Sequence, residues 1–293
     1  MLNIKGSIVA IVTPFNADGS VDYGKLEQLV NWHIAEGTDA IVALGTTGET
    51  PTLTTDECHK IVETTIATAN KRIPVIVGSG SNSTQQMLEK SRTYASMGAD
   101  GLLVISPYYN KANAEGMYRH FATVADAVDC PQILYNVPGR TGCAIPVSVV
   151  EKLSKHPNVA AIKEASGDLS YATAVSRYLN DGFAMYSGND DVIIPIMALG
   201  GSGVISVWAN AMPKTVHQLV ADYVSGNHAA ALQAQQKYYD FIKALFVEVN
   251  PIPVKAAMNL MGNHVGSLRL PLCDISPAGE AKLRAAMEEV GLL

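Results

Sequence analysis

Eight short apolar segments recur along the first three quarters of the chain, most of them beginning 25 to 34 residues apart. Each segment has about the length of one β-strand and is nearly continuous in Val, Ile, Leu or Ala. Continuous apolar segments are typical of parallel strands that are buried on both faces. The segments are GSIVAIVTPF (6–15), AIVALGTTGE (40–49), PVIVGSG (74–80), GLLVISPYY (101–109), QILYNVP (132–138), VAAIKEAS (159–166), AMYSGND (184–190) and GSGVISVWAN (201–210).

Helical patterns separate these segments. Thr54 and Glu57 have the spacing of a capping box, and the apolar residues that follow them keep helical periodicity. A second helix is predicted after Ser83, which is placed to cap its start, while Gly98 is placed to end it. Strands that alternate with helices predict a (β/α)8 barrel, and the eightfold count favours this fold over an open, doubly wound sheet.

The pattern changes near residue 227. NHAAALQAQQKYYDFIKALF, VKAAMNLMG and SPAGEAKLRAAMEEVGLL have helical patterns, and no further apolar strand segment follows. We therefore expect a catalytic barrel over residues 1–226 and a C-terminal appendage of about three helices over residues 227–293. Because no low-complexity linker separates them, the helices should pack on the barrel.

Polar residues gather where the apolar segments end, and the active sites of such barrels lie at those ends. Lys163 is the most informative of them, because it lies in the otherwise apolar VAAIKEAS. An uncharged amine attacks a carbonyl, and an apolar environment disfavours the ammonium form. A nucleophilic lysine is therefore one interpretation. The others are a lysine paired with an acid inside the barrel, or one that extends its ammonium to the barrel mouth.

Three neighbouring segments offer groups that suit such a lysine. Tyr135 could transfer protons, although it could equally be a hydrogen-bonded core tyrosine. Thr46 and Thr47 lie in the glycine-flanked GTTGE, which could hold a carboxylate or be only a tight turn before a helix. Arg140, in a Gly- and Pro-rich loop, suits bidentate binding of a carboxylate, unless it is an ordinary surface arginine.

Composition excludes several classes of function. The net charge of −6 and the absence of a basic stripe argue against a nucleic-acid partner. No HExxH or CxxC motif is present, so no metal is expected, and no nucleotide fingerprint indicates a cofactor. The first apolar run is too short for a signal peptide or a membrane span. Scattered cysteines fit a reducing compartment, and we expect a cytoplasmic protein. They are Cys58, Cys130, Cys143 and Cys273.

Taken together, these motifs resemble the dihydrodipicolinate synthase family, which also contains N-acetylneuraminate lyase. The resemblance runs essentially from end to end. It rests on TPF near the start, GTTGE, PYYN, YNVPGRTG, IKEASGD, SGND and the late NPIPVK. Any one of these motifs is weak evidence, but their combination at these separations is highly specific.

The resemblance implies a role for each matching residue. Lys163 would form a Schiff base with pyruvate, and Tyr135, Thr46 and Tyr109 would relay protons, with Tyr109 supplied by a neighbouring subunit. The substrate-binding residues would be Thr47 through its N–H, Arg140 on the carboxylate of the aldehyde, and the backbone carbonyls of Gly188 and Ile205. The reaction would condense pyruvate with L-aspartate 4-semialdehyde, without a cofactor, on the path to lysine and diaminopimelate. A homotetramer built as a dimer of dimers is implied as well.

One group of residues departs from the pattern of lysine-inhibited relatives. Asn82 and Tyr108 match the polar residues expected around the inhibitor cleft. Thr55, Cys58 and Gln86 stand where a histidine, a second histidine and a glutamate would be expected. Loss of a carboxylate weakens the binding of a cationic amino acid, so we expect weak inhibition by lysine or none.

Three other functions are compatible with part of this pattern. Another pyruvate-dependent aldolase, such as N-acetylneuraminate lyase, would share Lys163 and Tyr135, but Arg140 favours an acidic aldehyde over a sugar. A non-catalytic barrel that binds a small acid would not need the lysine, tyrosine and threonines together. A metal-dependent aldolase would need a cluster of ligands that the sequence lacks.

Overall fold

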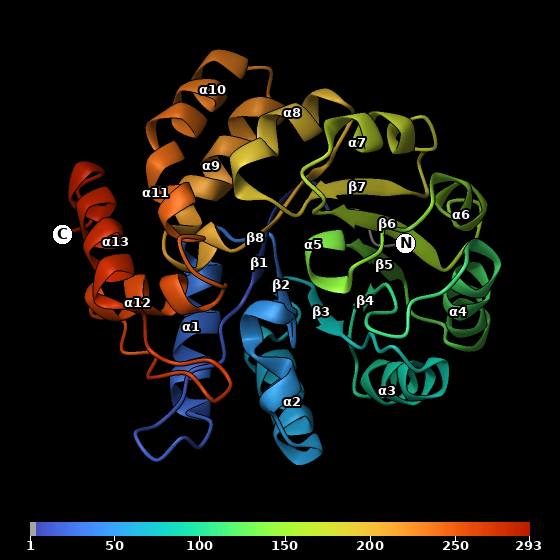
Figure 1. Cartoon of the computed structure of the whole chain (residues 1–293), viewed down its shortest axis with the longest axis horizontal. Coiled ribbons are helices and arrows are strands. Elements are labelled where there is room, and N and C mark those ends of the chain that lie inside the picture. The colour runs from blue at the N-terminus through green and yellow to red at the C-terminus, as the bar shows by residue number, and fades with distance from the viewer. Residues whose placement is uncertain (1–3) are drawn as a thin grey trace. The chain divides into compact units, whose positions relative to one another are not determined.

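The computed structural model describes residues 4–293, and its eight strands follow one another in chain order around a closed parallel barrel. The predicted (β/α)8 fold is therefore confirmed, and each strand lies within one of the predicted apolar segments (Figure 1). The strands are β1 (Gly6–Ala10), β2 (Ala40–Ala43), β3 (Val75–Gly78), β4 (Gly101–Ile105), β5 (Gln132–Asn136), β6 (Val159–Glu164), β7 (Ala184–Ser187) and β8 (Gly203–Ser206).

Helices alternate with the strands, and the two predicted caps are present. The Thr54 hydroxyl accepts a hydrogen bond from the Glu57 N–H while the Glu57 carboxylate accepts one from the Thr54 N–H. Ser83 caps the following helix through the N–H of Gln86. The helices are α1 (Tyr23–Ala35), α2 (Thr55–Ala69), α3 (Thr84–Ser96), α4 (Ala114–Ala127), α5 (Pro138–Thr141), α6 (Val147–Leu153), α7 (Leu169–Ser176), α8 (Ile193–Ala198) and α9 (Pro213–Val224).

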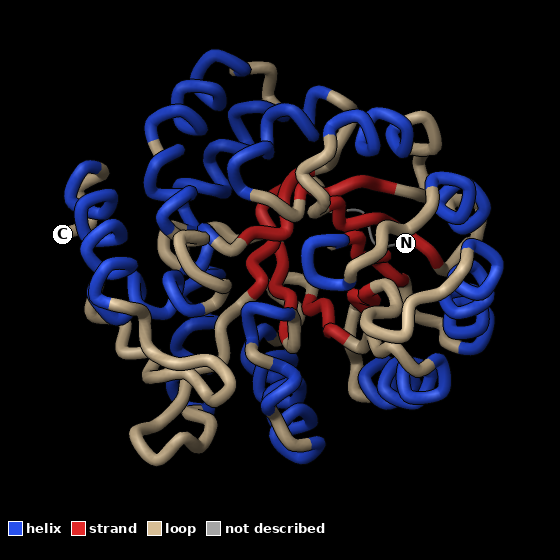
Figure 2. The backbone as a smooth tube through the Cα atoms, viewed as in Figure 1, coloured by secondary structure: helices blue, strands red, loops and turns tan. Residues whose placement is uncertain are grey.

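The C-terminal segment is helical, and no strand follows β8 in the described chain. It contains four helices where about three were predicted, because the first predicted helix is divided at Tyr238. A long connection without regular structure precedes the last helix (Figure 2). The four are α10 (His228–Lys237), α11 (Tyr239–Ala244), α12 (Ile252–Leu260) and α13 (Pro277–Glu289).

The described residues form two compact units. The first consists of residues 4–6 and 74–205, and the second of residues 7–73 and 206–293. The division of the chain at residues 226 and 227 stays a prediction.

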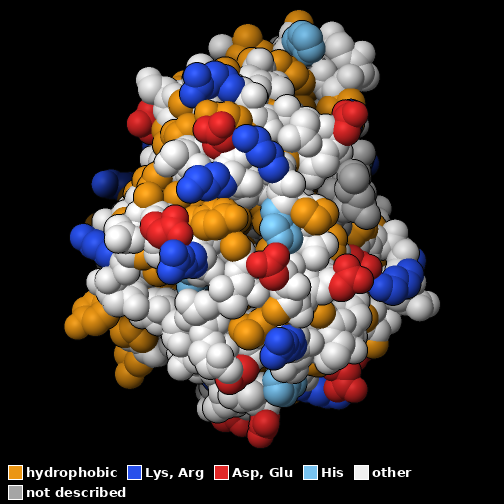
Figure 3. All heavy atoms as spheres, turned by 90° about the vertical axis from the view of Figure 1, so that its right-hand side faces the viewer, with side chains coloured by type: hydrophobic (Ala, Val, Ile, Leu, Met, Phe, Trp, Pro, Cys, Tyr) orange, Lys and Arg blue, Asp and Glu red, His pale blue; other side chains and the backbone are white. Residues whose placement is uncertain are grey.

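In the first unit, strands β3 to β8 pair in parallel, and α3, α4 and α6 lie outside β4 to β6 (Figure 1). All six residues of β6 are buried, which accounts for its nearly continuous apolar sequence. On the molecular face in Figure 3, basic and acidic side chains are interspersed.

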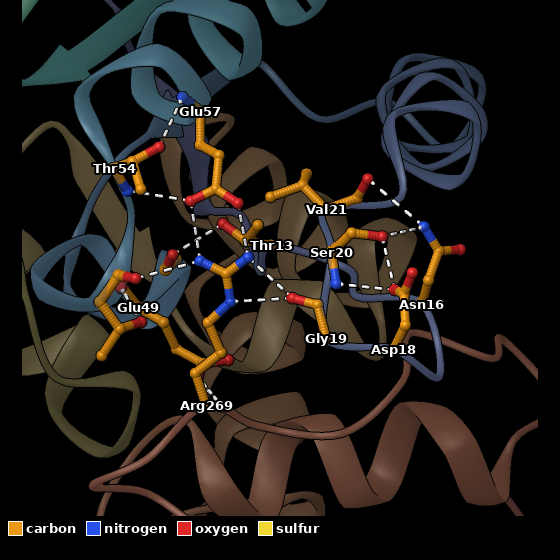
Figure 4. Close-up of polar contacts among 12 residues, drawn as sticks. Thr13, Asn16, Asp18, Gly19, Ser20, Val21, Glu49, Thr54, Glu57 and Arg269 are labelled. Atoms are coloured by element: carbon orange, nitrogen blue, oxygen red, sulfur yellow. Dashed lines mark hydrogen bonds and ion pairs between the residues drawn. The ribbon is translucent and has the colours of Figure 1, made fainter.

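In the second unit, Arg269 joins three segments (Figure 4). Its guanidinium donates to both carboxylate oxygens of Glu57 at 2.6 and 2.8 Å, and to the carbonyl oxygens of Gly19 and Thr52. This bidentate pair lowers the pKa of Glu57 to about 2, chiefly through the hydrogen bonds from Arg269. The connection between α12 and α13 is thereby fastened to the start of α2.

Candidate active site

Lys163 and Tyr135 face each other on adjacent strands of the first unit. They are direct partners in the β5–β6 register, and the lysine Nζ lies 4.5 Å from the centre of the tyrosine ring. Lys163 is 5% exposed and Tyr135 is 7% exposed. Within residues 4–293 no carboxylate lies at ion-pair distance from the Lys163 amine. The interpretation of Lys163 as one half of a buried ion pair is therefore wrong, and a buried amine beside a phenol remains.

Tyr186 is the other neighbour of Lys163 in the register, but its hydroxyl is already engaged. It donates to the carbonyl oxygen of Ile4 at 2.6 Å, and burial raises the pKa of Tyr186 to about 12. Of the two tyrosines paired with Lys163, Tyr135 is thus the one available for proton transfer.

Gly188 lies against the lysine. Its N–H donates to the carbonyl oxygen of Glu164 at 2.6 Å. A Cβ at this position would lie 2.5 Å from the Cβ of Ala165 and 3.0 Å from Cε of Lys163, so only glycine fits without displacement. Ile205 is fully buried in β8, next to Val204, which pairs with Ser187 of β7.

Arg140 lies in the short helix α5, where the sequence had indicated a loop. Thr141 stabilises this turn by donating to the carbonyl oxygens of Val137 and Cys143, and Gly142 ends it with a φ of 71°. Arg140 is exposed there. Lys111 adds a second cation to this segment, because its Cε would lie 3.4 Å from a Cβ built on Gly142. Lys111 was not predicted to lie there, because no local pattern around it indicates that it folds toward α5.

Tyr109 extends away from this chain. It is 92% exposed and has a φ of 68°, which is unfavourable for a bulky residue. The preceding residue, Tyr108, accepts a hydrogen bond from Asn82 at 3.2 Å, and Asn110 donates to the Asn82 carbonyl at 2.9 Å. Asn82 and Tyr108 therefore lie side by side in the folded chain, and their part in an inhibitor cleft stays a prediction. Gln86 is held near them by Ser81, whose hydroxyl donates to it at 3.1 Å.

Thr46 and Thr47 lie in the second unit, in a 3-10 turn that spans Thr46–Gly48. Thr47 is buried and accepts a hydrogen bond from Asn250 at 3.0 Å, and the Thr13 hydroxyl donates to the Gly48 carbonyl at 2.7 Å. The turn is therefore held by other segments. Thr55 and Cys58 lie in the first turns of α2, where Cys58 is buried and Thr55 is exposed.

A second buried lysine, Lys255, was missed because NPIPVK reads locally as a turn that leads into a helix. Its ammonium donates to Glu49 at 2.9 Å, to the Thr13 carbonyl at 3.0 Å and to the Ser267 carbonyl at 2.6 Å. Burial lowers the pKa of Lys255, and the Glu49 carboxylate opposes this shift. With all three donors engaged, Lys255 supports the fold, in contrast to Lys163.

Among residues 4–293, no group of three or more His, Cys, Asp or Glu side chains could hold a metal ion. Over the same residues, no helix is both long enough and apolar enough to cross a membrane.

The fold and the buried amine define a class, that of (β/α)8 barrels with a candidate lysine nucleophile on the sixth strand. The chain belongs to the dihydrodipicolinate synthetase family, whose model matches residues 3–290. The family expected from the motifs is therefore confirmed.

Individual relatives match over nearly the whole chain. The 4-hydroxy-tetrahydrodipicolinate synthase of Clostridium novyi is 48% identical over 98% of this chain and 97% of its own. That of Clostridium tetani is 50% identical over 99% and 98%.

Two solved structures share the fold closely. The chloride inhibited dihydrodipicolinate synthase of Acinetobacter baumannii, complexed with pyruvate, is 43% identical and has a TM-score of 0.96, over 99% of this chain and 100% of its own. The enzyme of Cyanidioschyzon merolae with lysine bound is 41% identical and also has a TM-score of 0.96, over the full length of both chains.

Proposed function

We propose that this chain condenses pyruvate with L-aspartate 4-semialdehyde to form 4-hydroxy-2,3,4,5-tetrahydrodipicolinate, as a lyase of lysine and diaminopimelate biosynthesis. The observation that carries the proposal is the buried amine of Lys163, 4.5 Å from the ring of Tyr135 and without an ion-pair partner in the described chain. Membership of the family and relatives near 50% identity support it.

Lys163 attacks the keto carbon of pyruvate, and the carbinolamine loses water to give an imine. Proton loss from the methyl carbon gives an enamine, because the protonated imine nitrogen accepts the electron pair. The enamine carbon then attacks the aldehyde, and a new carbon–carbon bond forms. The amino group of the second substrate displaces Lys163, which closes the ring and frees the enzyme.

Proton transfers accompany each of these steps. Tyr135 is proposed as the proton donor and acceptor nearest the amine, with Thr46 and Tyr109 completing the relay. Thr47 would bind the pyruvate carboxylate and Arg140 the carboxylate of the aldehyde, while the backbone of Gly188 and Ile205 shapes the site around the adduct. An exposed guanidinium suits the second role, because it binds a planar carboxylate through two hydrogen bonds.

The assembly is proposed to be a homotetramer made of two dimers, located in the cytoplasm. Tyr109 supports association, because its aromatic side chain is 92% exposed and its unfavourable backbone conformation holds it away from its own chain, where a neighbouring subunit could cover it. Sedimentation at micromolar concentration measures the mass, and a monomer that is fully active would contradict the shared tyrosine.

Weak inhibition by lysine is proposed as well. Thr55, Cys58 and Gln86 supply no carboxylate for a cationic amino acid. Initial rates measured with increasing L-lysine should fall little, and a steep fall at low lysine concentration would contradict the proposal.

Borohydride reduction in the presence of pyruvate tests the function directly. Reduction of the imine should add the pyruvate-derived group to the peptide that contains Lys163. Lys255, also buried but fully hydrogen-bonded, is the internal control and should stay unlabelled. Lys163→Ala should abolish labelling while the circular dichroism spectrum is unchanged. Labelling of another lysine, or turnover with N-acetylmannosamine but not with aspartate semialdehyde, would overturn the proposal.

A further inference from the structure

A buried polar pair lies directly beyond the Tyr135–Lys163 pair. Asn136 and Glu164 are the next partners in the β5–β6 register, and the Asn136 side-chain amide donates to a Glu164 carboxylate oxygen at 2.7 Å. Side chains alternate along a strand, so this pair lies on the face opposite the amine. Asn136 is 0% exposed and Glu164 is 3% exposed.

Every oxygen of this pair is engaged. The second carboxylate oxygen of Glu164 accepts from both the N–H and the hydroxyl of Ser166. The amide oxygen of Asn136 accepts from the N–H of Ile145 at 2.9 Å, and the carbonyl of Ile145 accepts from the Tyr171 hydroxyl at 2.7 Å. Unpaired polar groups are costly when buried, so each link fixes the orientation of the next.

This chain of hydrogen bonds joins three segments that carry proposed functional residues. Glu164 follows Lys163, Asn136 follows Tyr135, and Ile145 closes the segment that begins with α5 and contains Arg140. We propose that Asn136 and Glu164 are positioning residues, which hold the Lys163 amine against Tyr135 and set the place of the α5 segment. This inference rests on the proposed Schiff-base function and identifies the residues that orient its site.

The donor and acceptor pattern provides a matched set of variants of nearly equal size. Asn136→Asp places a carboxylate against a carboxylate. In Glu164→Gln, the new side-chain amide must point its N–H₂ group either at the Asn136 N–H₂ group or at the Ser166 N–H. In both orientations two hydrogen-bond donors face each other. The double variant Asn136→Asp with Glu164→Gln restores one donor for each acceptor and keeps the original charge.

The readouts are the rate of imine trapping with pyruvate and borohydride, and kcat and KM in a coupled reductase assay. Each single variant should slow trapping by about tenfold or more, because small displacements of reacting groups are costly. The double variant should recover to within about threefold of the wild type, since the coupled pair is restored. Ile133→Val, which loosens the packing of β5 without touching the polar pair, should lower the melting temperature but leave trapping unchanged.

A further variant, Tyr171→Phe, tests the link between the polar pair and the α5 segment. It also tests the inference if Asn136→Asp or Glu164→Gln does not fold. Tyr171→Phe removes the donor at the far end of the chain and should raise KM for the aldehyde by about threefold or more while imine trapping stays at the wild-type rate. Any of three results would overturn the inference. The single variants could trap pyruvate at the wild-type rate, the double variant could be no faster than the slower single variant, or Tyr171→Phe could leave the KM for the aldehyde unchanged. Failure of the wild type to trap pyruvate would instead overturn the proposed function.

Discussion

Replacement of Lys255 by methionine should destabilise the protein strongly. Methionine has a similar length and keeps the packing, but it removes the ammonium from a site where both Lys255 and Glu49 are almost fully buried. The carbonyl oxygens of Thr13 and Ser267 lose a donor at the same time. The Glu49 carboxylate then keeps the N–H of Arg269 as a hydrogen-bond partner, at 3.0 Å, but has lost the ammonium that contacted it at 2.9 Å.

The expected loss of stability follows from the burial of the Lys255–Glu49 ion pair. Removing one partner of a buried ion pair costs about 3–5 kcal/mol, because the remaining charge is neither solvated nor neutralised. The double variant Glu49→Gln with Lys255→Met removes both charges and should recover much of that loss. Arg284→Gln breaks the exposed pair with Glu280, whose side chains are 46% and 39% exposed, and should cost about 0.5 kcal/mol or less.

The free energy of unfolding should be measured by urea denaturation at neutral pH and at one protein concentration, because self-association adds to apparent stability. A loss below about 1 kcal/mol in Lys255→Met would refute the reasoning, since it would mean that water or another group replaces the ammonium. A double variant that is no more stable than the single variant would refute it equally.

Three further outcomes are expected. Gly188→Ala should slow imine trapping by about tenfold or more, because the added Cβ would lie 3.0 Å from Cε of Lys163, whereas Gly24→Ala in α1 should leave trapping unchanged. The pKa of Glu57 is lowered to about 2 in the folded chain. The ionised Glu57 carboxylate therefore stabilises the fold fully above the ordinary carboxyl pKa, and this contribution is lost as the pH falls toward 2. The difference in free energy of unfolding between wild type and Glu57→Gln, measured by urea titration, should shrink over that pH range. Tyr109→Phe should lower kcat more than it weakens pyruvate binding measured by calorimetry, and an unchanged kcat would contradict the relay.

Helices and strands that depend on a short local sequence pattern were predicted from the sequence. The strands were found because burial on both faces requires a nearly continuous apolar segment, as in β6. The start of α2 was found because Thr54 and Glu57 form a capping box within four residues. The predicted segment 40–49 extends beyond β2, which ends at Ala43, because Leu44 adopts a positive φ of 55°. Leu44 is still apolar, but the backbone does not remain extended there and the polar GTTGE turn follows.

The roles of the two buried lysines differ because of partners that the sequence does not bring together. In the sequence, Lys163 is a charged residue within an otherwise apolar strand segment, while Lys255 is an ordinary residue at the start of a predicted helix. The fold reverses the comparison: Lys255 is paired with Glu49, 206 positions away, whereas no carboxylate lies at ion-pair distance from Lys163 within residues 4–293. All three donors of Lys255 are engaged by Glu49 and two carbonyl oxygens, whereas the Lys163 amine lies against the ring of Tyr135 and is the amine proposed to attack a carbonyl. The different roles assigned to the two lysines therefore depend on whether a carboxylate lies beside the ammonium. Only the folded chain determines that, because Glu49 is far from Lys255 in the sequence.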